Sequence, residues 1–341
     1  MKSKYCLILA GILFISALFL GWVCQKDLRA GKHFKNTHII FFNGGPKGDS
    51  FATIVYNGAK AAASDLGATV EYVWSDWDPK KMALQFKEAI DEHPDAICMM
   101  GHPGDKMLRS LVDEAERKGI IVTLQNVDIP ALRTQYIDKG FGYAGQELYS
   151  SGMMLGRGVV QKFGSVKGQE ALVVGPGITE EKQALNERAM RTKGVIDALE
   201  KEGLIVYAQP LPLEVEKAPG ITGVDFFAKA LAMHPNVRVI VTDHGALTGE
   251  IGNILKKLGK KPGDFVVAGF DLSKQTVDGI REGYIGLVHD QQPYLQGYLP
   301  VVQACLSKKY GFSGLYIDTG VGLVDRSNID AVAEWARKQI R

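Results

Sequence analysis

Short apolar runs alternate with segments of helical spacing from about residue 38 to the end of the sequence. These runs are nearly continuous in Val, Ile and Leu and do not alternate with polar residues. Such runs are typical of strands buried on both faces, as in parallel sheets. The strands that this pattern predicts cover residues 38–42, 69–73, 96–100, 120–124, 171–174, 205–208, 237–241, 265–268 and 285–288.

The intervals between these runs have the spacing of helices. Apolar residues three or four apart predict helices over residues 79–92 and 104–118, and a final helix over residues 325–340. The series of strand, helix and strand occurs twice along the chain. It predicts an α/β protein with two doubly wound, Rossmann-like lobes, each built on a parallel sheet. We place the seam near residues 143–147, where the first series ends.

The N-terminus has the layout of a targeting segment. Lys2 and Lys4 precede an apolar run from Cys6 to Cys24, so residues 1–30 are interpreted as an export signal or a membrane anchor. The sequence leaves open whether the segment is cleaved, for example after Ala30, lipidated at Cys24 or retained. Each alternative puts the folded part in the periplasm or at the outer face of the cytoplasmic membrane.

The charge of the chain argues against nucleic-acid binding, and its cysteine content argues against a disulfide. The chain has 40 Lys+Arg and 38 Asp+Glu, and without residues 1–30 it keeps 36 and 37, a net charge of −1. A nearly neutral chain is a poor candidate for nucleic-acid binding, which needs clustered excess cations. Cys98 and Cys305 lie in apolar patterns, so we expect buried free thiols and no disulfide.

Polar and aromatic side chains follow the predicted strands at the ends where open α/β sheets bind ligands. They include Asp49 and Phe51 after the first strand, and Asp76-Trp77-Asp78 after the second. Carboxylates and amides can pair with adjacent hydroxyls, and an aromatic face suits the C–H side of a sugar ring. This composition indicates a neutral, polyhydroxylated ligand. The alternative is that these residues only form the turns between strands and helices.

Three segments resemble one family. They are Gly269-Phe270-Asp271, the stretch Asp290-Gln291-Gln292-Pro293-Tyr294-Leu295-Gln296-Gly297, and the Arg-x-x-Gly helix motif Arg191-Thr192-Lys193-Gly194. Together they are similar to the periplasmic sugar-binding proteins of ABC transporters, and most similar to the ribose-binding branch. The resemblance covers about residues 36–335.

The resemblance implies a type I periplasmic binding protein, with two lobes joined by a three-segment hinge. The implied N-terminal lobe comprises residues 36–146 and 292–320, and the C-terminal lobe residues 147–291 and 321–341. The family's sugar contacts fall on Asp49, Phe51, His102, Gln125, Asn126, Gln146, Arg191, Asp243, Phe270, Asp271 and Gln291.

Some positions depart from the ribose-binding pattern. Ala52 stands where the branch usually has a second aromatic, His102 replaces an Asn, and Gln125-Asn126 replaces an Asp-Arg pair. These changes alter which hydroxyls can be paired, so they argue against ribose itself. The cleft mode of binding is unaffected.

No catalytic constellation is visible, since the sequence has no HExxH, Walker or GxSxG motif. We therefore predict no enzyme, cofactor or metal. The prediction is a monomeric, exported protein that captures a monosaccharide or polyol and delivers it to an ABC permease. The alternative is a receptor of the same fold that reports to a chemoreceptor or sensor kinase. A regulator of the lac-repressor type is disfavoured, because an apolar segment occupies the place of its DNA-binding domain.

Overall fold

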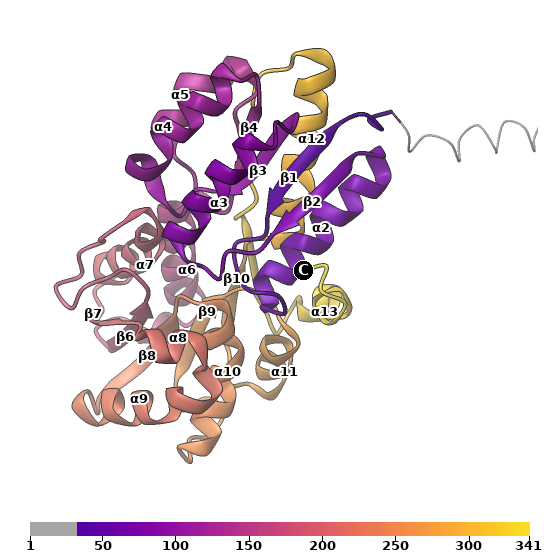
Figure 1. The fold of residues 1–341 in the computed structure, drawn as a ribbon. Coiled ribbons are helices and arrows are strands. Elements are labelled where there is room, and N and C mark those ends of the chain that lie inside the picture. The colour runs from indigo at the N-terminus through magenta and orange to yellow at the C-terminus, as the bar shows by residue number, and fades with distance from the viewer. Residues whose placement is uncertain (1–32) are drawn as a thin grey trace, which may run out of the picture.

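The computed structural model describes residues 33–341. The predicted export signal or anchor over residues 1–30, with Cys24, lies outside the described residues. The chain forms two lobes, one above the other in Figure 1, and each is built on a six-stranded sheet with helices on both faces. The fold class predicted from the sequence is confirmed.

The first sheet has the strand order β11-β5-β4-β3-β1-β2, and all of its pairings are parallel. Its strands are β1 (His38–Phe42), β2 (Thr69–Val73), β3 (Ala96–Met100), β4 (Ile121–Gln125), β5 (Gly142–Gly145) and β11 (Tyr316–Asp318). Its helices are α2 (Ser50–Leu66), α3 (Pro79–Asp91), α4 (Gly104–Arg117), α5 (Pro130–Tyr136), η2 (Ile137–Lys139) and α12 (Pro293–Tyr310).

The second sheet has the order β12-β10-β9-β8-β6-β7, and only β12 runs antiparallel to its neighbour. Its strands are β6 (Glu170–Gly175), β7 (Ile205–Pro210), β8 (Val237–Thr242), β9 (Val266–Phe270), β10 (Leu287–Asp290) and β12 (Gly322–Asp325). Its helices are α6 (Leu148–Lys162), η3 (Gly164–Val166), η4 (Glu187–Ala189), α7 (Met190–Lys201), α8 (Leu213–Lys217), α9 (Pro219–Met233), α10 (Gly245–Lys257), α11 (Lys274–Glu282) and α13 (Ile329–Arg337).

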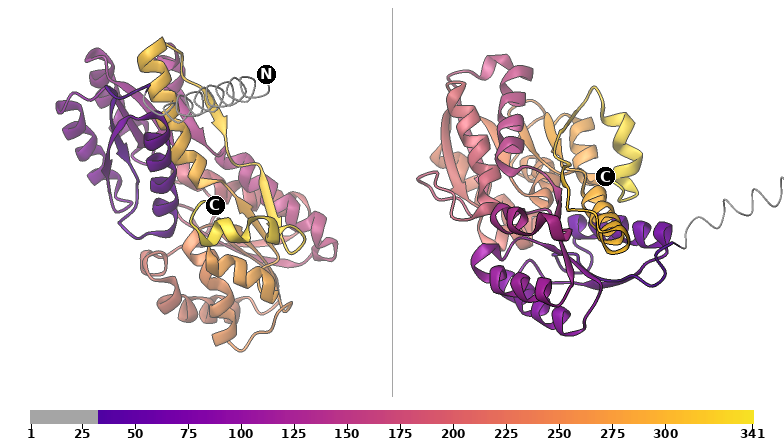
Figure 2. Two further views of the ribbon diagram at one scale, coloured as in Figure 1. Left: turned by 90° about the vertical axis from the view of Figure 1, so that its right-hand side faces the viewer. Right: turned by 90° about the horizontal axis from the view of Figure 1, so that it is seen from above.

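The chain passes between the two sheets three times. It does so between β5 and α6, between β10 and α12, and between β11 and β12. Figure 2 shows α12 returning to the first lobe and α13 lying against the second. The middle crossing contains Gln292, which has a positive φ of 56°.

The strand prediction missed strands β5, β11 and β12. Strand β5 reads GYAG, and its two glycines hide it from a pattern based on Val, Ile and Leu. Strand β11 has only 3 residues and is largely exposed. The prediction of a final helix over residues 325–340 was wrong at its start, because Asp325 ends strand β12 and α13 begins only at Ile329.

Close helix packing fixes the backbone beside the cleft. Helices α6 and α7 cross so closely that a Cβ on Gly152 would lie 2.0 Å from the carbonyl oxygen of Arg191. A Cβ on Gly194 would likewise lie 2.2 Å from the oxygen of Tyr149. Only glycine permits this approach at either position, so the pair Gly152 and Gly194 determines where Arg191 lies.

Both cysteines of the described residues are free thiols. Cys98 and Cys305 are free and buried, as predicted. In residues 33–341, no helix combines the length and the apolar character needed to cross a bilayer.

Candidate functional site

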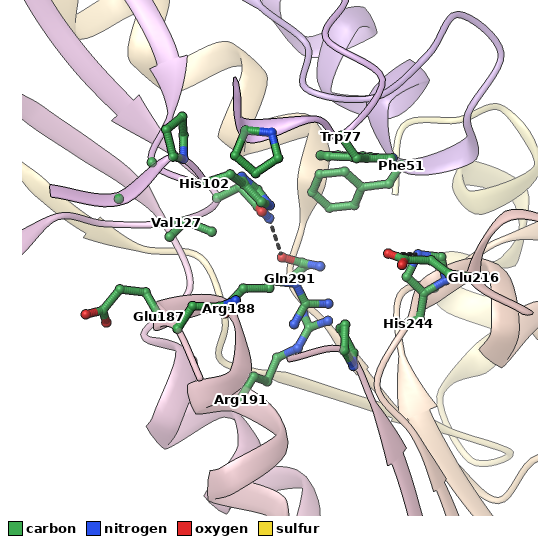
Figure 3. A pocket seen from close by; sticks show the side chains of 18 of the residues that line it. Phe51, Trp77, His102, Val127, Glu187, Arg188, Arg191, Glu216, His244 and Gln291 are labelled. Carbon is green, nitrogen blue, oxygen red and sulfur yellow. Dashed lines mark hydrogen bonds and ion pairs between the residues drawn. The ribbon is translucent and has the colours of Figure 1, made fainter. Parts of the chain in front are cut away.

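A cleft of about 420 Å³ lies between the lobes, where the carboxyl ends of both sheets meet. Figure 3 shows Phe51 and Trp77 on one side of it, Arg188 and Arg191 on the other, and Gln291 between them. The structure brings together on its lining these residues predicted from the sequence: Asp49, Phe51, His102, Asn126, Arg191, Asp271 and Gln291.

The structure places the other four predicted residues behind the lining. Gln125 is buried and donates from Nε2 to the carbonyl of Phe42 at 2.8 Å. Gln146 lies at the first crossing, while Asp243 and Phe270 are buried beneath Arg191. These residues position the lining and do not form its surface.

Arg191 is held from two sides. Its Nε and Nη2 lie 2.6 and 2.5 Å from Oδ1 of Asp243, and its guanidinium stacks 4.1 Å from the ring centroid of Phe270. The other carboxylate oxygen of Asp243 accepts from the hydroxyl of Thr192. Burial by itself raises the pKa of Asp243, but the charges of Arg191 and Arg188 outweigh it and lower the pKa below its usual value. Asp243 is therefore an ionised anchor for Arg191.

Gln291 connects side chains from both lobes. Its Oε1 accepts from Nδ2 of Asn126 at 3.2 Å and from Nε2 of Gln146 at 2.8 Å. Its Nε2 donates to Oδ1 of Asp271 at 2.5 Å. Asn126 and Asp271 both have positive φ, 64° and 73°. Asn and Asp adopt this left-handed conformation more readily than other non-glycine residues, and here the hydrogen bonds to Gln291 hold both side chains in place.

Aromatic side chains form the wall on the first lobe. The rings of Phe51 and Trp77 lie 5.9 Å apart, and that of His102 lies 5.5 Å from Trp77. The indole Nε1 of Trp77 approaches Oδ2 of Asp49 at 3.4 Å. A Cβ on Gly45 would lie 2.7 Å from the indole, so the glycine leaves room for the ring.

Sequence reasoning missed several charged or polar residues of the second lobe that line the cleft. Arg188 on η4, Glu216 on α8 and Asn186 all line the cleft. One signal was available for Arg188, since it stands three residues before Arg191 and such residues share a helix face. Glu216 follows Pro210, the last residue of β7, by six residues, so the rule that ligand-binding residues follow strand ends could have pointed to it as well.

Arg188 has spare hydrogen-bonding capacity. Its contacts with Asp243 are long, 3.5 Å from Nη1 to Oδ1 and 3.4 Å from Nη2 to the backbone oxygen. Burial and the neighbouring charge of Arg191 lower its pKa. A guanidinium carries five N–H donors, so most of those of Arg188 are left for a ligand.

Burial also shifts the pKa values of the other titratable groups of the cleft. It lowers the pKa of His102 to about 3 and that of His244 to about 4, and nearby Arg188 adds to both shifts. Both rings are therefore neutral at pH 7, and the 3.6 Å approach of His244 to Glu216 is no ion pair at that pH. Burial raises the pKa values of Asp49, Glu216 and Asp271.

The structure offers no arrangement for a metal in the part that it describes. Over residues 33–341, no three His, Cys, Asp or Glu side chains are grouped so that they could hold an ion. Asp243 pairs with Arg191, and Asp290 accepts from Arg341.

A model of the family described as periplasmic binding protein domain matches residues 39–307. The chain belongs to this family. The resemblance predicted from the sequence is confirmed, and the family is one of binding proteins, as predicted. A xylose/arabinose-binding protein of Sulfolobus acidocaldarius is 30% identical over 230 residues, which make up 63% of this chain and 53% of that protein. The chain thus spans about half the length of this curated relative.

Solved structures have the same fold. A carbohydrate transporter from Acidothermus cellulolyticus 11B, in complex with myo-inositol, has a TM-score of 0.72 and 25% identity, with coverage of 89% of this chain and 99% of that one. An ABC transporter solute-binding protein from Burkholderia graminis C4D1M also has a TM-score of 0.72, at 22% identity, and covers 88% of this chain and 97% of that one. The second likeness shows the fold alone.

Proposed function

We propose that this protein captures a monosaccharide or related polyol in the cleft and delivers it to an ABC permease. One observation carries the proposal: the aromatic wall of Phe51 and Trp77 faces Arg188 and Arg191 across the cleft, whose lining also includes Asp271. A sugar ring has apolar C–H faces and a rim of hydroxyls. The aromatic wall suits the faces, and the charged groups suit the hydroxyls.

The relatives support the same class of ligand. The protein from Sulfolobus acidocaldarius is named for xylose and arabinose, and the structure from Acidothermus cellulolyticus contains myo-inositol. A pentose, a hexose and a cyclitol all present vicinal hydroxyls without a net charge. The departures at Ala52, His102 and Asn126 from the ribose pattern direct the search to sugars other than ribose.

Capture would proceed by closure of the lobes about the three crossings. Ligand touching both lobes stabilises only the closed arrangement, so the difference in affinity between open and closed forms sets the population shift. Gln291 suits the centre of this movement, because it contacts Asn126 of the first lobe and Asp271 of the second.

The partner and the compartment follow from the proposed role. The closed form would dock on a permease whose ATPase supplies the energy, outside the cytoplasmic membrane and as a monomer. The N-terminal lobe would comprise residues 36–146 and 292–320, and the C-terminal lobe residues 147–291 and 321–341.

Isothermal titration tests the proposal. Xylose, arabinose, ribose, glucose, galactose, fucose and myo-inositol are each titrated into the protein, with the Arg191→Ala variant as the control for binding in the cleft. We expect saturable binding of at least one sugar at one site per chain, and its loss in the variant. Absence of binding across the panel would refute the sugar class.

A further inference from the structure

An exposed aromatic patch lies at the end of α12. Tyr310, Phe312 and Leu315 are 56%, 57% and 57% exposed, and the rings of Tyr310 and Phe312 lie 5.8 Å apart. Ile137, at 39% exposure, adjoins them, since its carbonyl accepts from the backbone of Gly314 at 2.7 Å. We call these four apolar side chains, with Lys309, the terminal patch.

The described chain begins beside this patch. Nζ of Lys309 lies 3.5 Å from the carbonyl oxygen of His33, 5.0 Å from the ring centroid of Phe34 and 5.1 Å from that of Tyr310. Figures 1 and 2 show the start of β1 and the end of α12 at the same end of the first lobe. The first described residue, His33, therefore lies next to the patch.

The sequence limits how far that segment can reach. The apolar run ends at Cys24, so eight residues, 25–32, connect it to His33. Fully extended, they span at most about 29 Å. If the apolar run stays in a bilayer, the end of the lobe that carries the terminal patch is held close to the membrane surface.

The composition of the patch matches that surface. Tyr and other aromatic side chains are favoured at the level of the lipid headgroups, and Lys side chains reach from there toward anionic lipid. Lys35, Lys308 and Lys309 are all exposed, and among them Lys308 pairs with a carboxylate, that of Asp95 at 2.7 Å. The remaining positive charge is available to phospholipid headgroups.

We propose that the terminal patch rests on the headgroup layer of the membrane that retains residues 6–24. The bound partner is a bilayer surface containing anionic phospholipid. The patch lies at the amino ends of the strands of the first sheet, whereas the cleft lies at their carboxyl ends. Helix α12 leads from the middle crossing to the patch over 18 residues, or about 27 Å at 1.5 Å each. Resting on the patch thus keeps the cleft clear of lipid.

Photo-crosslinking of the full chain in membranes tests this proposal. Benzoylphenylalanine is placed at Phe312 in one variant and at Ile221 in a matched control. Ile221 is apolar and 80% exposed on α9 of the second lobe. The two proteins are reconstituted in bilayers of phosphatidylethanolamine with phosphatidylglycerol as the minor lipid, and lipid adducts are quantified by mass spectrometry.

We expect adducts with lipid to be several-fold more abundant from position 312 than from position 221. In a Lys35→Glu/Lys309→Glu background, the yield at position 312 should fall several-fold. Equal yields at the two positions, adducts with residues 1–32 of the same chain, or a protein that does not stay with the membrane would each overturn the proposal. The result does not depend on which ligand the cleft binds, because no ligand is present.

Discussion

Asp243 is wholly buried, and its Oδ1 lies 2.6 Å from Nε of Arg191. From the sequence, both residues were expected to contact the ligand. In the structure, the carboxylate instead fixes the guanidinium that faces the cleft. The pair explains how a charged side chain can be held still at a cleft wall before any ligand arrives.

Breaking this pair should destabilise the fold. Asp243→Ala leaves Arg191 buried without its partner, and such a loss typically costs about 3–5 kcal/mol in the free energy of unfolding. Urea unfolding measures the cost. Lys274→Ala is the control, because it breaks the exposed pair with Asp278 and should change the free energy by about 0.5 kcal/mol or less. Similar values for the two variants would contradict the anchoring role.

Arg188 should behave in the opposite way. It makes only long contacts and lies beside the like charge of Arg191, so Arg188→Met should leave the free energy of unfolding unchanged or raise it. Its loss should nevertheless weaken ligand binding by about 1.5–3 kcal/mol, the range for a hydrogen bond to a charged group. Calorimetry measures the change in ligand affinity, and urea unfolding of the same sample measures the change in stability. A parallel loss of stability and affinity would show that Arg188 only supports the fold.

Gly152→Ala tests whether helix packing positions the site. The new Cβ would lie 2.0 Å from the oxygen of Arg191, so α6 and α7 must separate. Overpacking of this kind costs about 1–3 kcal/mol, and ligand affinity should fall as Arg191 moves. Gly164→Ala serves as the control, since a Cβ added there would have nothing within 4 Å. Unchanged affinity in Gly152→Ala would show that the packing of α6 against α7 does not position Arg191 for binding.

His289 should make stability depend on pH. It is fully buried at the hinge, and its Nε2 donates to the carbonyl of Gly320 at 2.9 Å, since a carbonyl can only accept. Burial lowers its pKa to about 4. Below pH 6.5 the unfolded chain therefore binds a proton that the folded chain does not, and stability is lost as the pH falls from 6.5 toward 4.

The predicted size of this effect follows from the two pKa values. Between pH 7 and pH 5, wild type should lose about 2 kcal/mol more of its free energy of unfolding than His289→Gln, which keeps a donor but does not titrate. Urea unfolding at the two pH values gives the difference. Equal losses in the two proteins would mean that His289 is protonated in the folded state as readily as in the unfolded one.

The sequence predicted the strands that carry a clear signal. Strands β1, β2 and β3 begin and end at the residues predicted from the sequence. Strand β5 was not predicted because it contains Gly142 and Gly145. A Cβ at the first would collide with the side chain of Gln303, and a Cβ at the second with that of Tyr143. A pattern of apolar residues cannot reveal positions that are small because a neighbour approaches.

The site was predicted less completely, for a physical reason. Strand ends locate polar residues, but they do not say which of them pair with one another. Asp243 and Gln125 follow strands as ligand-binding residues do, yet one is held by Arg191 and the other by the carbonyl of Phe42. Glu216 reaches the cleft from the short helix α8, which begins three residues after β7 ends, and it lies within that helix rather than in the turn directly after the strand.

A crystal structure of the protein with the tightest-binding sugar tests the central claim most directly. We predict the ring between the aromatic wall of Phe51 and Trp77 and the guanidinium groups of Arg188 and Arg191, with Gln291 in contact. Sugar bound elsewhere, for example in the pocket between α8 and α9, with the cleft empty at saturation, would contradict the account.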